Sequence, residues 1–212
     1  MSLASEMAPH DGYEVADDDL TVVAAALQNL LAFAPLYERY FPLIHGYCLR
    51  RLGHTETAAD ATSQIFINAI QALPSFKPHP KRPGSSFRSW LFSIAHNVVV
   101  DSYRRARPQI SLDKPAAHGD ESTLIDRMTD TDPSPEDLAI AAESRSHLGA
   151  LLAQLPERQA AIVDLRLAGL TNAEIAEALN ISYPAVRSAQ YRAFQALRAL
   201  LDSPSDQTGD RS

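Results

Sequence analysis

Hydrophobic residues recur at helical spacing through the first half of the 212-residue chain. Between Phe33 and Cys48 they stand three or four positions apart, which predicts one face of a helix with a kink at Pro42. A second amphipathic pattern follows Thr55, a residue type that favours helix starts, and ends at Pro74. The pattern therefore predicts two consecutive amphipathic helices.

A third helix is predicted after residues 77–84, which contain three prolines and three basic residues and should form an exposed loop. Ser85 or Ser86 can start this helix. Its buried stripe is expected to comprise Phe87, Leu91, Ile94 and Val98. Trp90 lies beside the stripe, which favours a core role over a surface role for its ring.

The second half of the chain repeats the helical pattern. Leucines recur from Leu148 to Leu155, a new helix can begin at Pro156, and Gly169 should end it. No segment alternates strictly between apolar and polar residues, and β-branched residues are scattered. The predicted fold class is therefore all-α.

Thr171 and Glu174 have the spacing of a capping box, in which each side chain bonds a backbone amide at the start of a helix. This helix should be short, because Asn180 suits a left-handed turn position soon afterwards. Ser182 and Pro184 then predict the start of a longer helix. The spacing is typical of a helix-turn-helix, with a plain helical hairpin as the alternative.

In a helix-turn-helix, the second helix enters the major groove of DNA. The expected small core comprises Ile175, Leu179, Ile181 and Val186. The outward positions of the second helix hold Arg187, Ser188, Tyr191 and Arg192. Arginine can bind guanine edges or phosphates, whereas serine and tyrosine mainly bind phosphates.

Charge is arranged in blocks that the net value of −7 conceals. Residues 1–30 carry −6, residues 31–107 carry +6 and residues 108–137 carry −6. A basic unit between acidic segments is typical of a polyanion-binding domain, although solvated surface charge gives the same pattern. We expect residues 1–30 to form an acidic extension that folds back over the basic unit. The alternatives are a free tail or a helix that starts near Asp19 and packs on the domain.

Residues 87–97 read F-R-S-W-L-F-S-I-A-H-N and precede Asp101 and two arginines. This phrase resembles the second conserved region of bacterial sigma factors of the extracytoplasmic-function group, in which F-R-x-W-L-x-x-I-A-x-N precedes D-x-x-R-R. Residues 60–66 are similar to the polymerase-binding helix of that family. Residues 155–159 and the helix-turn-helix resemble its fourth conserved region. The resemblance covers residues 33–107 and 138–201.

The resemblance implies a protein that binds core RNA polymerase and promoter DNA and is held by an anti-sigma factor. Its first domain would read the −10 element as a single strand through His96, Asn97, Arg104 and Arg105. Its second would read the −35 duplex through the outward residues of the helix-turn-helix. The implied polymerase contacts are Asp60, Ser63, Gln64 and Phe66, where Ser63 and Gln64 replace the usual Gln and Glu.

The expected organisation has five parts. An acidic extension (1–30) precedes the first domain (31–107), and an acidic flexible linker (108–137) leads to the helix-turn-helix domain (138–201) and a tail (202–212). The linker would thread the polymerase near its RNA exit. The main alternative is a stand-alone helix-turn-helix regulator that binds operator DNA, and a helical adaptor is a third possibility.

No motif of a catalytic or metal site occurs. The seven histidines never reach a metal-ligand spacing, and no phosphate-binding loop or G-x-S-x-G motif is present. The single cysteine, Cys48, excludes an internal disulfide. No apolar run approaches the length of about 18 residues that spans a membrane. We therefore expect a cytoplasmic protein with no enzymatic activity, no cofactor and no metal.

Overall fold

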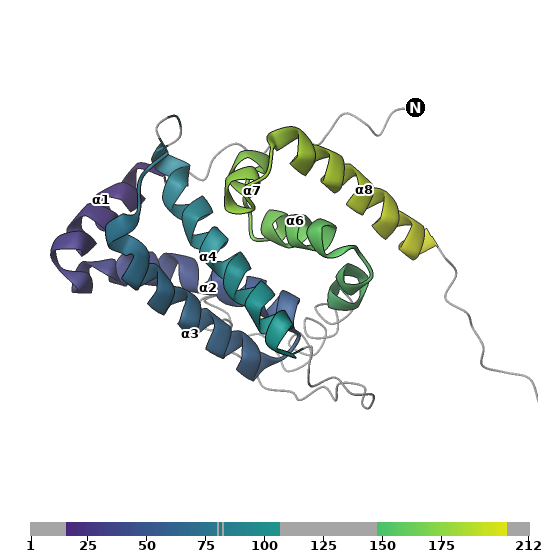
Figure 1. The fold of residues 1–212 in the computed structure, drawn as a ribbon, viewed down its shortest axis with the longest axis horizontal. Coiled ribbons are helices and arrows are strands. Elements are labelled where there is room, and N and C mark those ends of the chain that lie inside the picture. The colour runs from purple at the N-terminus through teal and green to yellow at the C-terminus, as the bar shows by residue number, and fades with distance from the viewer. Residues whose placement is uncertain (1–15, 80, 82, 107–147, 203–212) are drawn as a thin grey trace, which may run out of the picture.

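The computed structural model describes residues 16–79, 81, 83–106 and 148–202, and this part of the chain is helical without strands (Figure 1). The all-α prediction is confirmed. The segment expected to be a linker, residues 108–137, lies outside the described residues, as does the tail from residue 203 onwards. The described residues form two helical units, which we call the first unit (residues 16–106) and the second unit (residues 148–202).

The first unit is a helical bundle. Its elements are α1 (Ala16–Gln28), η1 (Leu30–Phe33), α2 (Ala34–Leu52), α3 (Thr55–Ala72), η2 (Leu73–Ser75) and α4 (Pro83–Ala106). Aromatic rings fill much of its core, where Phe87 of α4 contacts the rings of Phe33, Tyr40, Phe76 and Trp90. The half-buried Trp90 thus packs on the core, as its position beside the stripe predicts.

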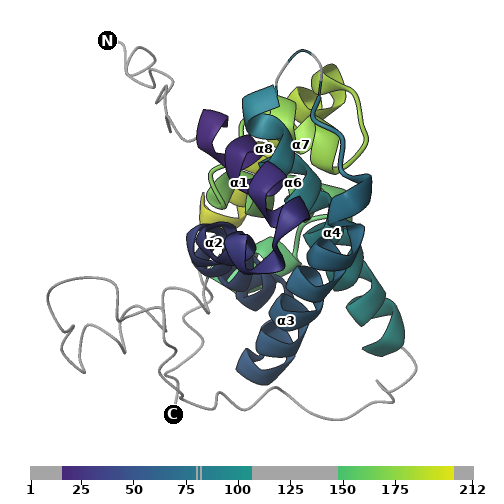
Figure 2. The same ribbon diagram turned by 90° about the vertical axis from the view of Figure 1, so that its left-hand side faces the viewer.

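Helix α1 corrects the expectation that residues 1–30 form a separate acidic extension. It packs against α4 and η1, so residues 16–28 belong to the first unit (Figure 2). Asp19 is buried in this contact, and its carboxylate accepts hydrogen bonds from Arg39 and from the Tyr40 hydroxyl. Asp19, one of the acidic residues of this segment, is therefore part of the folded core and not a solvated charge. Residues 1–15 lie outside the described residues.

The helix boundaries refine the sequence predictions. Helix α2 continues through Pro42 and ends at Gly53, whose φ of 76° is the left-handed conformation that glycine adopts easily. Helix α3 begins at Thr55, but the N-cap residue is His54, and no side chain caps the helix. Helix α4 begins at Pro83, before the serines expected to start it.

The second unit contains a helical segment at residues 148–153 and three further helices: α6 (Glu157–Leu167), α7 (Asn172–Ala178) and α8 (Tyr183–Asp202). The predicted leucine stripe packs against α6 and α8, where Leu152 and Leu155 contact Val163 and Ala193 in a small core of their own. The predicted breaks after Leu155 and at Gly169 are confirmed, because α6 lies between them.

The two units pack directly on each other. Helix α4 lies between the bundle and the second unit, where it contacts α7, and α2 contacts α6 (Figures 1 and 2). One continuous apolar core runs through both units and includes Phe87 and Leu91 of α4 together with Ile162, Leu165 and Ile175 of the second unit. Two faces of α4 are therefore covered, although its sequence predicts a single buried stripe.

Candidate nucleic-acid interface

The turn of the second unit has the conformation that its sequence predicts. The Glu174 amide donates to Thr171 Oγ1 at 3.3 Å, and the Thr171 amide donates to Glu174 Oε2 at 2.7 Å, which completes the capping box. Asn180 has a φ of 50°, in the left-handed region. Ser182 Oγ then accepts a hydrogen bond from the Ala185 amide at the start of α8. These local bonds fix how α8 leaves α7.

Helix α8 presents its predicted reading residues to solvent. Four side chains on its first three turns are exposed: Arg187, Ser188, Tyr191 and Arg192. Tyr183, Pro184, Arg187, Ser188 and Tyr191 line a shallow hollow on this surface. Val186 and Ile175 are fully buried behind it, as the helix-turn-helix pattern predicts. This combination of a fixed helix and an exposed polar face suits insertion into a major groove.

Helix α4 carries the second predicted nucleic-acid face. Asn97, Asp101, Arg104 and Arg105 are all exposed, and their spacing of four, three and one positions places them on one side of the helix. Arg104 Nη1 lies 3.6 Å from Asp101 Oδ1, and Arg105 Nε donates to the Asp101 carbonyl at 3.3 Å. The amide of Asn97 is thus accessible beside two cationic side chains.

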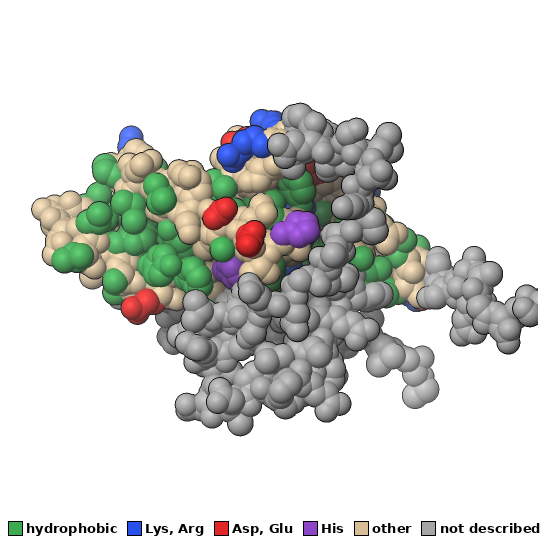
Figure 3. Space-filling view, turned by 90° about the horizontal axis from the view of Figure 1, so that it is seen from below, with side chains coloured by type: hydrophobic (Ala, Val, Ile, Leu, Met, Phe, Trp, Pro, Cys, Tyr) green, Lys and Arg blue, Asp and Glu red, His purple; other side chains and the backbone are tan. Residues whose placement is uncertain are grey.

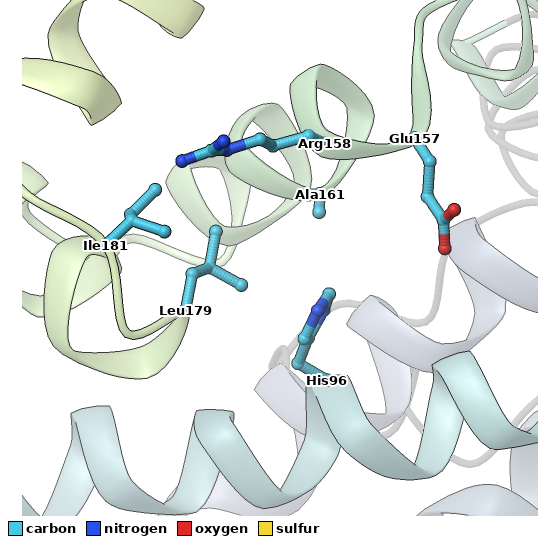
Figure 4. Close-up of a pocket in the computed structure, with 6 residues that line it drawn as sticks. All are labelled: His96, Glu157, Arg158, Ala161, Leu179 and Ile181. Atoms are coloured by element: carbon cyan, nitrogen blue, oxygen red, sulfur yellow. The ribbon is translucent and has the colours of Figure 1, made fainter.

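His96 does not share the exposed face of Asn97. Its ring points from α4 toward the second unit and lines a cavity of about 240 Å³ with Glu157, Arg158, Ala161, Leu179 and Ile181 (Figure 4). Burial lowers the pKa of His96, and the Arg51 guanidinium lowers it further. In this arrangement the predicted −10 contact His96 faces α6 and α7, which leaves Asn97 as the exposed member of the pair.

Asp164 of α6 meets two arginines of the first unit. Arg50 Nε donates to Asp164 Oδ1 at 3.3 Å, and Arg51 Nη1 lies 3.7 Å from Oδ2. The side chain of Asp164 is 1% exposed, so this ion pair is formed inside the contact between the units. Burial raises the pKa of Asp164, whereas both guanidiniums act to lower it.

Helix α4 makes further polar contacts across the same boundary. Arg88 Nη2 donates to the Ala168 carbonyl at 3.1 Å, and Arg88 Nη1 lies 3.9 Å from Glu174 Oε1. Ser89 Oγ donates to Glu177 Oε2 at 2.8 Å, and His79 Nε2 lies 3.5 Å from Glu177 Oε1. Arginines of the first unit thus face acidic residues of the second at two places, and Ser89 and His79 face Glu177 at a third.

Gly169 allows the close approach of Arg88. A Cβ at this glycine would lie 2.8 Å from Arg88 Nη2, nearer than ordinary contact. Its φ of 84° also favours glycine over other residues. The residue that ends α6 therefore also makes room for an arginine of the other unit.

The predicted polymerase face of α3 is partly exposed. Asp60, Ser63 and Gln64 point to solvent, whereas Phe66 is 3% exposed and packs on Tyr37 with ring centroids 4.7 Å apart. The expectation that Phe66 makes a direct contact is corrected, because this ring belongs to the core. Ile67, which the sequence analysis did not select, is 49% exposed and lies seven positions after Asp60 on the same face.

Hydrophobic side chains also gather on the surface around this face (Figure 3). Tyr37 of α2 and Ile67 of α3 are both large and exposed, as are Leu30 and Leu31 of η1. Exposed apolar groups of this size on a polar rim mark protein interaction surfaces more often than nucleic-acid contacts. The signal for Ile67 was available in the sequence as an apolar residue outside the buried stripe of α3.

Other classes of site find no support in the described residues. Within this part of the chain, no group of three or more His, Cys, Asp or Glu side chains is placed to hold a metal ion. Cys48 is buried, and burial raises the pKa of its thiol to about 11. Across the helices described, none has the length and apolar character needed to cross a membrane.

Comparison with known proteins identifies both units. The Sigma-70 region 2 family matches residues 36–109, and the Sigma-70 region 4 family matches residues 146–197. The chain is 32% identical over 185 residues to the ECF RNA polymerase sigma factor SigD of Mycobacterium tuberculosis, covering 85% of this chain and 82% of that protein. It is 29% identical over 171 residues to the ECF sigma factor SigW of Bacillus subtilis, covering 80% and 89%.

Solved structures agree. CnrH, in a complex with the cytosolic domain of CnrY, is similar with a TM-score of 0.65 and 26% identity, covering 89% of this chain and all of that one. The sigma factor RpoE of Bartonella quintana, in a complex with the anti-sigma factor NepR, shares the fold with a TM-score of 0.57 and 18% identity, covering 82% and 98%. The alternative of a stand-alone regulator is not favoured, since both conserved regions are present in order. The chain belongs to the extracytoplasmic-function family of RNA polymerase sigma factors, which direct the polymerase to promoters.

Proposed function

We propose that this sigma factor divides promoter reading between two helices, with α4 binding the −10 element as a single strand and α8 binding the −35 duplex. The observation that carries the proposal is the exposed face of α8, where Arg187, Ser188, Tyr191 and Arg192 follow a fixed helix-turn-helix turn. Residues near the start of a recognition helix are the ones that reach base edges.

On α4, Asn97 is the proposed reader of an unstacked base. An exposed amide can pair with the Watson–Crick edge of such a base, and single-strand binding adds cationic contacts to the backbone. Arg104 and Arg105 lie on the same side of the helix and supply these contacts. His96 joins this site only when the second unit moves away, because its ring faces α6 and α7 here.

For core RNA polymerase we propose the surface formed by α2 and α3. Its polar members are Asp60, Ser63 and Gln64, and its apolar members are Tyr37 and Ile67. Ser63 Oγ donates to the Ala59 carbonyl at 3.0 Å, and Gln64 Nε2 donates to Asn68 Oδ1 at 2.7 Å. Phe66 supports this surface from beneath by packing on Tyr37.

We place the domain boundaries near residues 16 and 106 for the −10 domain and near residues 148 and 202 for the −35 domain. The protein acts in the cytoplasm, where core polymerase is found, and contributes binding while the polymerase supplies the chemistry. An anti-sigma factor is its proposed regulator, since the similar protein CnrH was solved with the cytosolic domain of CnrY.

Co-purification with core polymerase tests the polymerase surface. The wild-type chain should be retained on immobilised core polymerase in stoichiometric amounts. Ile67→Asp should weaken retention at least about tenfold, because it buries a charge in an apolar contact. Leu201→Asp, on an exposed leucine of α8, is the matched control and should be retained like the wild type. Equal retention of both variants would place the polymerase surface elsewhere.

A further inference from the structure

The closed arrangement of the two units does not allow both promoter elements to be read at once. The −10 and −35 elements are about 25 base pairs apart, which is about 85 Å along B-form DNA at 3.4 Å per base pair. A compact body of this size has a radius of gyration of about 15 Å. Helix α4 contacts α7, and α7 contacts α8, so both reading helices belong to one such body. The units must separate before initiation.

The buried boundary between the units has a specific electrostatic pattern. Among the described residues, the polar pairs that arginines, His79 and Ser89 make across it join basic or hydroxyl groups of the first unit to acidic residues or carbonyls of the second. The acidic residues are Asp164, Glu174 and Glu177. The second unit thus places carboxylates against a positively charged surface of the DNA-reading unit, in the way that phosphates would contact it.

From this complementarity we propose that the free sigma factor holds itself closed through a latch formed by Asp164 of region 4 with Arg50 and Arg51 of region 2. The latch keeps His96 under α6 and α7 and keeps α4 and α8 too close to span a promoter. When the latch opens, α4 and α8 can move apart to bind the −10 and −35 elements. This regulation rests on the proposed division of promoter reading between α4 and α8.

Asp164 is the central residue because its side chain pairs with two arginines across the boundary. It lies 1% exposed on α6, and its side-chain partners among the described residues are Arg50 and Arg51 of α2. Arg50 Nη2 also donates to the Asp164 carbonyl at 3.3 Å, which adds a backbone contact at the same place. When the units separate, the carboxylate can enter water.

The latch is suited to opening because the cost of burying its charges offsets part of their attraction for each other. Removing two charged groups from water costs free energy that their mutual attraction repays only with good geometry. Here Arg51 Nη1 is 3.7 Å from the carboxylate, and Arg51 Nε is buried without a hydrogen-bond partner among the described residues. Burial also raises the pKa of Asp164 in spite of the two guanidiniums. A binding partner therefore has only a small net attraction to overcome at this ion pair.

Energy transfer between two dyes on the full chain measures closure directly. Gln71→Cys on α3 and Gln195→Cys on α8 are exposed positions on opposite units. The natural Cys48 is buried with its pKa raised to about 11, so it is poorly labelled at neutral pH. Wild-type protein should show high transfer alone and lower transfer after core polymerase is added.

Asp164→Asn is the test variant, and Asp202→Asn is its matched control, since Asp202 is exposed on α8 and pairs with Arg198 of the same helix. Asp164→Asn should shift the closed-to-open ratio at least about tenfold toward open and raise affinity for core polymerase. The double variant Asp164→Asn/Arg51→Gln should be no more open than the more open of the two single variants, because each substitution removes the same interaction.

The outcomes separate the latch from the proposed function. Unchanged dye transfer in a folded, helical Asp164→Asn chain overturns the latch. If circular dichroism shows that Asp164→Asn is unfolded, Arg50→Gln is measured in its place. If the latch is wrong but the division of promoter reading is right, the variants still transcribe with core polymerase, while dye transfer in the free Asp164→Asn chain stays as high as in the free wild type. If the division is wrong, dye transfer stays high even on a polymerase-bound promoter.

Discussion

Ser89 Oγ donates a hydrogen bond to Glu177 Oε2 at 2.8 Å, which joins α4 of region 2 to α7 of region 4 across 88 positions of the chain. The serine is 3% exposed, although it lies on a helix that is expected to read DNA. Helix α4 therefore has one face in the bundle, one face against region 4 and one open face. The open face is the one that carries Asn97.

Because Asn97 is exposed, replacing it should spare the fold and affect the reading of DNA. We expect Asn97→Ala to reduce promoter opening about tenfold or more while affinity for core polymerase is unchanged. Permanganate reactivity of thymines in the −10 region measures the opening. Gln71→Ala, at an exposed polar site on α3, is the control. Normal opening in Asn97→Ala would assign the base pocket to other residues.

Arg187 lies on the first turns of α8 with its side chain exposed. If it binds a guanine edge, Arg187→Ala should cost about 1–3 kcal/mol of discrimination at one base pair of the −35 element. Binding to duplexes with single substitutions measures this loss. Arg198→Ala, on the last turns of the same helix, should leave base preference unchanged. A uniform loss of affinity with a smaller salt dependence would instead identify Arg187 as a phosphate contact.

Asp19 tests whether α1 is part of the fold. Asp19→Ala removes the carboxylate that accepts from Tyr40 inside the core, and we expect the free energy of unfolding to fall by about 1–3 kcal/mol. Urea denaturation measures the change. Glu56→Ala, at an exposed acid of α3, should stay within about 0.5 kcal/mol of the wild type.

Truncation separates the same two views of the N-terminus. Removal of residues 1–15 should leave stability unchanged, whereas removal of residues 1–28 should destabilise the first unit because α4 and η1 lose their contacts with α1. An N-terminal segment that only masks DNA-binding charge would behave differently. Its removal would raise DNA affinity at low salt without any loss of stability.

Stability should fall in mild acid. Burial lowers the pKa of His45 below its ordinary value of 6.5, so the unfolded chain binds more protons as the pH falls through this range. His96 acts in the same direction. Each of the two histidines reduces the free energy of unfolding by at most about 1.4 kcal/mol per pH unit. The raised pKa of Asp164 opposes this trend at pH values above its ordinary value of 3.8, because there the folded chain holds the extra proton.

Urea denaturation at about pH 7.5 and about pH 5.5 measures the effect of pH. His45→Gln should reduce the difference between the two conditions, because the buried ring next to Thr62 no longer titrates. His54→Gln, at an exposed histidine, should retain the full difference. An unchanged difference in His45→Gln would assign the pH dependence to other groups.

Local features of the fold were predictable from the sequence. The capping box of Thr171 and Glu174, the left-handed Asn180 and the exposed face of α8 each depend on neighbours within about 20 positions, and the structure confirms them. The break at Gly169 is equally local. Such features follow from helix-end hydrogen bonds and from helical periodicity, which short segments specify on their own.

Contacts between the units were not predictable. Arg50 and Asp164 are 114 positions apart, and each alone has the appearance of an ordinary surface charge on a helix. The burial of Ser89 on α4 has the same origin, because its hydroxyl bonds Glu177 of region 4 on a side of the helix that local periodicity leaves open. A packed helix near Asp19 was only an alternative in the sequence analysis, because the acidic residues of this segment favoured a solvated extension, whereas Asp19 is paired in the core.

Reconstituted transcription is the most direct test of the central claim that the chain is a promoter-reading subunit of RNA polymerase. Core polymerase is mixed with the purified chain and a pool of genomic fragments, and RNA 5′ ends are mapped. We predict discrete start sites and permanganate-reactive −10 thymines only when core polymerase and the chain are both present. Specific starts without the chain, or discrete duplex binding by the chain with no effect on start sites, would contradict the claim.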